Sequence, residues 1–287
     1  IFLFFISLIS LFLVPFVGIE VKGSKRWIDL FFLPRFQPIE VLKPFLIIIL
    51  ATIFCDIRSN ILFKYLISII LISVISLLLI AQPDIGQTLL VVFCWAALIF
   101  TSGINIYILL AIFIAGASLL AYLIIYVPKF DYIQGRIFSF FNRETGTHNF
   151  QSDKAIESIT SGGFFGKGIG EGVLKNRVPE AHTDYIISVI SEEFGVVAIM
   201  LILLLFLILI YMVFKKISFE TNDKAKLILI GSISLILMQA TIHIGVNIRL
   251  FPTTGMTLPF LSYGGSSIIS TSILAGIILN LTKRKIT

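Results

Sequence analysis

The stretch PEAHTDYIISVISEEFGVVAIMLILLLFLILIYMVF, residues 179–214, joins a polar hexapeptide directly to an apolar run. The run from Tyr185 to Phe214 is longer than the roughly 20 residues that a helix needs to cross a bilayer, so it predicts a membrane-spanning helix. The hexapeptide places a carboxylate, an imidazole and a hydroxyl group where the chain enters lipid. Ionisable groups at such a boundary are costly unless they bind, pair or react. This junction is therefore the first place to expect a functional site.

The composition of the whole chain agrees with a membrane protein. Hydrophobic residues make up 57% of the sequence, the mean hydropathy is +1.04, and only 13% of residues are charged. Soluble domains carry about a quarter charged residues. The net charge of +6 is assigned to loops that meet lipid headgroups or an anionic substrate, rather than to nucleic-acid binding. Cys55 and Cys94 lie in apolar runs without metal-site spacing, so we expect them to be buried thiols.

Eight apolar segments predict an all-α polytopic fold with about eight transmembrane helices. We expect one integral membrane domain over residues 1–287, with a long polar loop, residues 128–184, between the fifth and sixth spans. Pro44 is acceptable in the second span because the N–H groups of a first helical turn are unpaired. The predicted spans are 1–18, 38–55, 62–80, 86–103, 106–127, 185–214, 227–248 and 266–282.

The basic residues of the short loops favour one orientation in the membrane. Eight spans put both ends of the chain on the same side, and positive charge marks the cytoplasmic side. The loops and tail on that side hold Arg58, Lys64, Lys215, Lys216, Lys224, Lys226, Lys283, Arg284 and Lys285. We therefore expect the 128–184 loop and the hexapeptide to face away from the cytoplasm.

The first polar patch on that outer face comprises GSKRWIDL, residues 23–30, and QPIEVLK, residues 37–43. Trp27 beside two basic residues is typical of an interfacial anchor, and that reading has about even weight with a functional one. Lys43 lies within an apolar helix, where it must snorkel or find a carboxylate. Glu40, three positions earlier, is a possible local partner.

Two further patches contain acidic residues and glycines. Asp84 in QPDIGQT, residues 82–88, is predicted to cap the next helix. The segment SGGFFGKGIGEG, residues 161–172, lacks the preceding strand and the GK[ST] ending of a nucleotide-binding loop. We expect either close packing on a large ligand or positive-φ glycines. Of Glu192 and Glu193, one is expected to point into the bundle and pair.

The last patch is NIRLFPTTGMTLPFLSYGGSS, residues 247–267, whose prolines, glycines and hydroxyl groups interrupt apolar sequence. This segment is expected to re-enter the membrane and line a cavity. Gln239, His243 and Asn247 precede it at four-residue spacing, so they share one inward helical face. Hydrogen bonds between helices and contact with a ligand explain that stripe equally well.

Taken in order, these motifs resemble the SEDS family of membrane proteins (shape, elongation, division and sporulation). The matching motifs span nearly the whole chain, from GSKRWI, QPxExxK and QPDxG to the glycine-rich loop, PEAHTDYI with EEFG, and GMTLPFLSYGGSS. Ala181 and GMTLPF are most similar to the division branch. Ile39 replaces a serine that the family usually has. The family usually has ten spans, so we expect this chain to be either a fragment or the product of a truncated gene, equivalent to the last eight.

The resemblance implies a glycosyltransferase that polymerises lipid II into peptidoglycan strands during cell division, on the outer face of the cytoplasmic membrane. Asp184 matches the family's essential aspartate and is the candidate general base, because a carboxylate can take the proton from an attacking sugar hydroxyl. Lys43 matches a lysine expected beside that aspartate. The candidate substrate-binding residues are Lys25, Arg26, Gln37, Glu40, Arg136, Lys167, Glu180, His182, Ser262 and Ser266.

Positive charge or a divalent cation, Mg²⁺ or Mn²⁺, is expected to stabilise the departing diphosphate. The resemblance also implies a class B penicillin-binding protein and other division proteins as partners, with no nucleic acid. Two alternatives remain: a flippase or transporter of lipid II, or a non-catalytic scaffold for division proteins.

Overall fold

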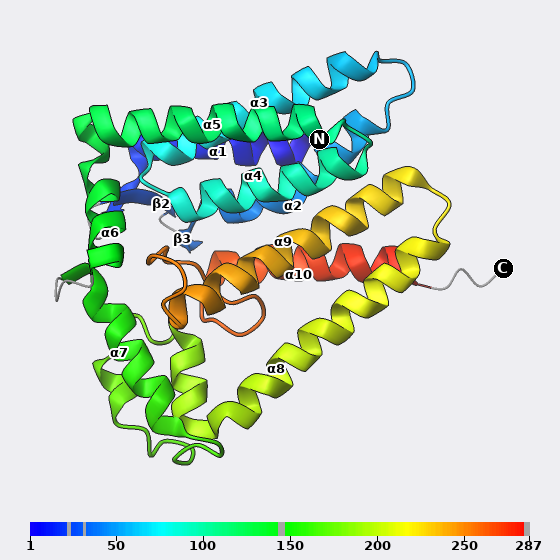
Figure 1. Ribbon diagram of the computed structural model, residues 1–287. Helices are drawn as coiled ribbons and strands as arrows, with labels where there is room; N and C mark the ends of the chain where they lie inside the picture. Colours follow the sequence, from blue (N-terminus) through cyan, green and yellow to red (C-terminus); the bar gives the residue numbers. More distant parts are fainter. Residues whose placement is uncertain (22–23, 31–32, 143–146, 284–287) are drawn as a thin grey trace. The chain divides into compact units, whose positions relative to one another are not determined.

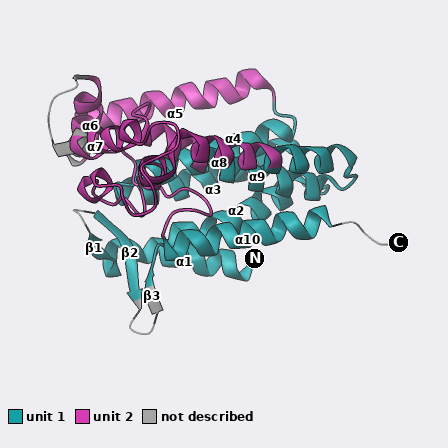
Figure 2. Ribbon diagram, turned by 90° about the horizontal axis from the view of Figure 1, so that it is seen from below, with its two compact units in different colours: residues 1–104, 209–238, 264–287 teal, residues 105–208, 239–263 magenta. Residues whose placement is uncertain are grey.

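The computed structural model describes residues 1–21, 24–30, 33–142 and 147–283. The described chain divides into two compact units (Figure 2), which are described separately. Unit 1 comprises residues 1–104, 209–238 and 264–287, and unit 2 comprises residues 105–208 and 239–263.

Helices occupy all eight of the predicted apolar segments (Figure 1). They are α1 (Phe2–Val17), α2 (Pro38–Phe54), α3 (Ile61–Ala81), α4 (Ile85–Thr101), α5 (Ile106–Tyr126), α8 (Ile186–Phe219), α9 (Asp223–Asn247) and α10 (Gly265–Thr282). Within the described residues, five of these helices are long and apolar enough to cross a membrane, namely α3, α5, α8, α9 and α10. Helices α1 and α4 are apolar but shorter. The all-α polytopic membrane fold is confirmed.

Helix α2 is the central helix of unit 1, where it packs against α1, α3, α4 and α10. Helix α1 turns one face to this packing, with Phe4, Ser7, Leu11 and Val14 buried at helical spacing. The first part of α9 also packs closely on α2, since a methyl group at Gly231 would lie 2.7 Å from the side chain of Ile47. A polar side chain on the buried face of α2 is therefore surrounded by protein.

The segment between α1 and α2 forms strands that the sequence analysis did not predict. Strands β1 (Ile19–Val21), β2 (Ser24–Leu30) and β3 (Leu33–Phe36) form an antiparallel sheet in the order β1–β2–β3. Ile19 pairs with Trp27, and Ile28 pairs with Phe36. The β-branched and aromatic residues favour strands. The predicted patch GSKRWIDL is thus a sheet strand from Ser24 on; Gly23 lies outside the described residues.

The polar stretch 128–184, predicted as a loop, is largely helical in unit 2. It contains η1 (Pro128–Phe130), α6 (Asp131–Asn142), α7 (Thr147–Gly162) and η2 (Leu174–Arg177). Two small cores hold this unit together: Ala155, Val178, Ala181, Tyr185 and Val246 form one, and Ile187, Ala240 and Leu258 form the other. These cores join α7, the start of α8 and the end of α9 around the hexapeptide.

Candidate functional site

The hexapeptide PEAHTD folds into a tight turn that leads into α8. Glu180 adopts a positive φ of 57°, and its carbonyl oxygen accepts hydrogen bonds from the N–H groups of Thr183, Asp184 and Tyr185. The Thr183 hydroxyl also donates to the Glu180 carboxylate, at 3.2 Å. Asp184 is half-buried and stands immediately before Tyr185 and the first residue of α8. The turn thus holds the predicted base at the start of a membrane-spanning helix.

The segment before α10, residues 255–263, is hydrogen-bonded to the hexapeptide. The Ser262 hydroxyl donates to the carbonyl oxygen of Thr183 at 2.6 Å, and the Tyr263 N–H donates to the carbonyl oxygen of His182 at 2.9 Å. A methyl group at Gly255 would lie 3.5 Å from Oδ2 of Asp184. The backbone of this segment therefore borders the Asp184 carboxylate.

The polar stripe of α9 supports both segments. Gln239, His243 and Asn247 are all buried, as predicted. The Gln239 side chain donates to Thr257, His243 Nδ1 lies 2.7 Å from the carbonyl oxygen of Met256, and the Asn247 amide donates to the carbonyl oxygen of Asp184. These partners are backbone groups of unit 2 and, for Gln239, also a threonine hydroxyl group, which favours the interpretation that the stripe organises the fold.

Arg136 of α6 is the basic candidate near this region of unit 2. Its Nη1 atom donates to the carbonyl oxygen of Thr253 at 3.3 Å. The His182 side chain is exposed, whereas its carbonyl oxygen is bonded as described above. Unit 2 therefore brings together Asp184, Glu180, His182, Ser262 and Arg136 from the predicted set.

Unit 1 brings together a second group of predicted residues around α2. Lys43 is fully buried, and its Nζ atom lies 2.9 Å from Glu40 Oε1 and 3.1 Å from Gln87 Oε1. The Gln87 amide also donates to Glu40 Oε1, at 2.6 Å. The local partner suggested for Lys43 is confirmed. Its pairing with Asp184 of unit 2 stays a prediction.

Asp84 links the remaining residues of this group. It caps α4 as predicted, accepting from the Gln87 N–H, and it also accepts from Gln37 Nε2 at 3.0 Å. Arg26 Nη1 lies 3.6 Å from Asp84 Oδ1. Burial raises the pKa of the Asp84 carboxyl, and the Arg26 guanidinium opposes that rise. The Gln37 N–H donates to Ser266 Oγ, which joins α10 to the network.

Gln87 and Asp84 are members of this network that the sequence analysis did not assign to the site. Capping was the favoured interpretation of Asp84, which was not among the candidate site residues, and Gln87 was not singled out. The available signal was the position of Gln87 three residues after Asp84, which places its side chain on the same end of α4. A buried amide there needs partners, as does the buried pair on α2.

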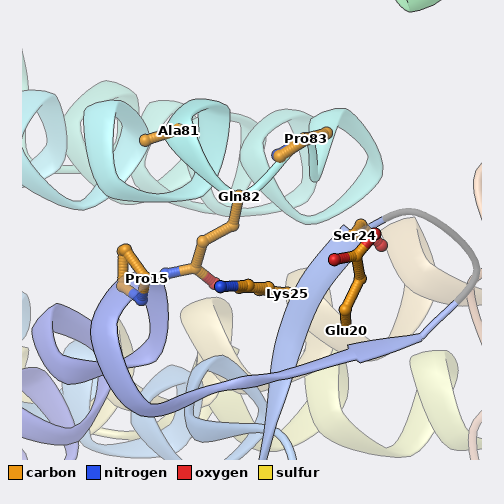
Figure 3. A pocket seen from close by; sticks show the side chains of 7 residues that line it. All are labelled: Pro15, Glu20, Ser24, Lys25, Ala81, Gln82 and Pro83. Atoms are coloured by element: carbon orange, nitrogen blue, oxygen red, sulfur yellow. The ribbon is translucent and has the colours of Figure 1, made fainter.

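Lys25 lies apart from this network, at a small pocket of unit 1. The pocket has a volume of about 260 Å³ and is lined by Pro15, Glu20, Ser24, Lys25, Ala81, Gln82 and Pro83 (Figure 3). The Arg26 guanidinium donates hydrogen bonds to the carbonyl oxygens of Gln82 and Pro83, which lie in the turn between α3 and α4. The two adjacent basic residues of GSKRWIDL therefore have different surroundings.

Lys167 and the two glutamates of α8 form a third arrangement. The Glu192 carboxylate is fully buried and accepts from the N–H groups of Val173, Leu174 and Lys175. It also accepts from the Ser158 hydroxyl at 3.0 Å and lies 3.4 Å from Lys167 Nζ. The prediction that one of the two glutamates is buried and paired is confirmed. Its backbone partners directly follow the glycine-rich loop, and Lys167 of that loop thereby has a structural partner in Glu192.

Comparisons with known proteins agree with the motif analysis. A family profile covering FtsW, RodA and SpoVE, described as "Cell cycle protein", matches residues 1–286. The chain is 34% identical to the probable peptidoglycan glycosyltransferase FtsW of Caulobacter vibrioides, over 95% of this chain and 69% of that protein. It is 32% identical to the FtsW protein of the same description from Enterococcus hirae, over 97% and 73%.

Solved structures give the same result. A chain of a peptidoglycan synthase complex, reported for the structural coordination of polymerization and crosslinking, matches with a TM-score of 0.78 and 29% identity, over 98% of this chain and 79% of that chain. The rod shape determining protein RodA of Thermus thermophilus matches with a TM-score of 0.67 and 30% identity, over 98% and 75%. With its motifs, its helices and these matches in agreement, the chain belongs to the FtsW/RodA/SpoVE family of cell cycle proteins.

Proposed function

We propose that the chain is a peptidoglycan glycosyltransferase of cell division that polymerises lipid II, with Asp184 as general base. The observation that carries the proposal is the position of Asp184, a carboxylate directly before a membrane-spanning helix. Its backbone N–H donates to Glu180 in the same turn, and its backbone carbonyl accepts from Asn247 of α9. A lipid-linked substrate presents its sugars at that depth. The family relatives named peptidoglycan glycosyltransferase support the same assignment.

In the proposed reaction, a sugar hydroxyl oxygen attacks the anomeric carbon of the donor. The bond from that carbon to the diphosphate breaks, the diphosphate departs with the electron pair, and Asp184 takes the hydroxyl proton. A diphosphate leaving group needs no acid to protonate it, unlike the alkoxide of ordinary glycoside hydrolysis. The protein's remaining task is to offset negative charge, for which Arg136, Lys43, Lys25, Arg26 and Lys167 are the candidates.

A divalent cation stays a prediction. Within the described residues there is no group of three or more His, Cys, Asp or Glu side chains that could hold a metal ion. Mg²⁺ is often bound by one or two carboxylates together with substrate phosphates. A cation bound in that way would be held by a carboxylate of the chain together with the diphosphate of the substrate.

The test of the proposal is polymer formation by the purified protein, in the presence of its transpeptidase partner, with lipid II in detergent. Asp184→Asn is expected to lower the rate by about 10²–10⁴-fold, the contribution of a general base. Asp131→Asn, which changes an exposed carboxylate of α6, is the matched control and should keep the rate. An Asp184→Asn protein with activity within a few-fold of the unsubstituted chain would show that the base lies elsewhere.

The same assay separates the two alternatives. A flippase cannot make polymer where no bilayer exists, and a scaffold cannot make it at all. A class B penicillin-binding protein is proposed as the partner. Its support is the resemblance, together with the match to a peptidoglycan synthase complex.

The proposed orientation puts the hexapeptide on the outer face of the bacterial cytoplasmic membrane. Single cysteines in intact cells, tested with an impermeant thiol reagent after replacement of Cys55 and Cys94, decide this. Ser152, within the 128–184 loop, is unsuitable for labelling because it is buried on α7. Glu157→Cys on α7 should react in intact cells, and Ile57→Cys, which is 96% exposed between α2 and α3, only after lysis. Lys285, on the predicted cytoplasmic tail, lies outside the described residues.

A further inference from the structure

Helix α8 is broken inside its own length, at Gly195. That residue has φ 77° and ψ −174°, so the helical ladder stops there and starts again (Figure 1). The break separates a short segment, residues 186–194, from the long apolar segment, residues 196–219. A break of this kind leaves N–H groups of the second segment and carbonyl groups of the first without helical partners.

The glycine-rich loop supplies the missing partners. The N–H groups of Val196 and Val197 donate to the carbonyl oxygens of Gly163 and Phe164, at 3.0 and 3.2 Å. In the other direction, the N–H groups of Lys167 and Gly168 donate to the carbonyl oxygens of Glu192 and Glu193, at 2.9 and 3.0 Å. Unsatisfied backbone groups are costly near lipid, so these bonds let the helix break at a membrane boundary.

This docking fixes the loop tightly and at the same time turns its large side chains outward. A methyl group at Gly195 would lie 2.2 Å from the carbonyl oxygen of Phe164, and one at Gly166 would lie 2.1 Å from that of Glu193. Yet the side chains of Phe164 and Phe165 are 75% and 84% exposed, and that of Ile169 is 79% exposed. Large apolar side chains that stay exposed on a well-bonded backbone mark a surface that contacts a protein partner or a membrane.

The neighbouring helix α8 points to the membrane as that contact. Helix α8 is long and apolar enough to cross a membrane, and few residues of its most apolar stretch are buried by the described protein, as expected for a helix that faces lipid. Phe164 is bonded to Val197, at the start of this lipid-facing segment. The two exposed phenyl rings therefore lie on a loop bonded to the start of the long apolar segment of α8, and aromatic residues beside the end of a membrane span are typical interfacial anchors.

We propose that Phe164 and Phe165 insert into the bilayer interface and anchor the broken end of α8, with lipid as their occupant. The anchor fixes the depth of segment 186–194, which begins immediately after Asp184 and Tyr185. Membrane insertion of the loop does not depend on the catalytic assignment. The anchor gives Phe164 and Phe165 a role that the proposed reaction does not use.

The test places a nitroxide spin label on Phe165→Cys in the full chain, with Cys55 and Cys94 replaced by Ser. The protein is reconstituted in phosphatidylethanolamine–phosphatidylglycerol vesicles, and collisions with oxygen and with a water-soluble nickel chelate are measured. Leu204→Cys, on the lipid-facing part of α8, is the lipid control, and Glu157→Cys on α7 is the water control. Labelling Phe164→Cys separately keeps the test decisive if one variant misfolds.

The expected result is a shift of the oxygen-to-nickel ratio at both rings toward the value at Leu204. A ratio equal to that at Glu157 would place the loop in water and overturn the proposal. Low access to both reagents would show that protein covers the rings, and would also overturn it.

Discussion

The side-chain amide of Asn247 donates a hydrogen bond to the backbone carbonyl of Asp184, at 3.1 Å. The same amide donates to the carbonyl oxygen of His243, one turn earlier on α9, at 2.9 Å. One buried side chain therefore joins the end of α9 to the residue proposed as base. The position of Asp184 depends on a helix that is distant in sequence.

Asn247→Ala is expected to lower both stability and the rate of polymerisation. Loss of the amide leaves the Asp184 carbonyl without this donor, at a cost of about 1–3 kcal/mol. Asn105→Ala, which removes the side chain that caps α5 by accepting from the Tyr107 N–H, costs about 1 kcal/mol in the same way. Melting temperature and turnover number are measured for both. A positioning role requires that only Asn247→Ala lowers the turnover number, and equal turnover numbers would refute it.

Glu192→Ala is expected to be among the most destabilising changes in unit 2. Its carboxylate accepts from three consecutive backbone N–H groups and from Ser158. Removing one side of a buried charged network costs about 3–5 kcal/mol. Glu192→Gln keeps one acceptor oxygen and should lose less stability than Glu192→Ala. The measurement is thermal unfolding in detergent, with Glu171→Gln, an exposed residue of the same loop, as the control. Similar melting temperatures for Glu192→Ala and the control would contradict the network.

Gly166→Ala and Gly170→Ala distinguish close packing from backbone conformation. Both glycines have positive φ, 77° and 83°, so alanine costs roughly 1–3 kcal/mol of strain at either position. At Gly166 the new methyl group would also collide with the Glu193 backbone, whereas nothing lies within 4 Å at Gly170. Gly166→Ala should therefore lower the melting temperature clearly more than Gly170→Ala. Equal losses would mean that the loop is not docked on α8.

The apolar helices could be predicted from the sequence because hydropathy alone locates them. Helix α3, for example, was expected at residues 62–80 and spans Ile61–Ala81. Strands β1–β3 were not predicted, because a basic pair beside Trp27 is equally typical of an interfacial anchor. Helices α6 and α7 were not predicted either, because neither is apolar enough to be recognised as a membrane span, and hydropathy was the signal that located the other helices.

The candidate site was predictable in its residue types but not in its partners. The sequence placed Lys43 in an apolar helix, so a partner was required, and Glu40 at three-residue spacing was the local choice that the structure bears out. Gln87 contacts both through tertiary packing of α4 on α2, which no local pattern encodes. Likewise, the acids at 192 and 193 demanded partners, but only the folded loop shows that backbone N–H groups provide them.

The remaining prediction concerns Lys43 and Asp184, which the resemblance places beside one another. Lys43 has local partners in Glu40 and Gln87, so Lys43→Met leaves the Glu40 carboxylate without its cation in the core of unit 1. We expect a loss of stability of about 3–5 kcal/mol, which Glu40→Gln in the same chain should largely restore. Measuring activity in the chain that carries both Glu40→Gln and Lys43→Met separates an effect on catalysis from an effect on stability.

In the rescued background, Glu40→Gln with Lys43→Met, activity reports whether the lysine also serves Asp184. If the ammonium keeps the Asp184 carboxylate ionised, its loss should lower polymerisation nearly as fully as Asp184→Asn, because an opposite charge within reach favours the anion. Adding Asp184→Asn should then make little further difference. Additive losses in this cycle would show that the two residues act independently. Recovery of both stability and activity in the rescued background would confine Lys43 to the buried network of α2 and α4.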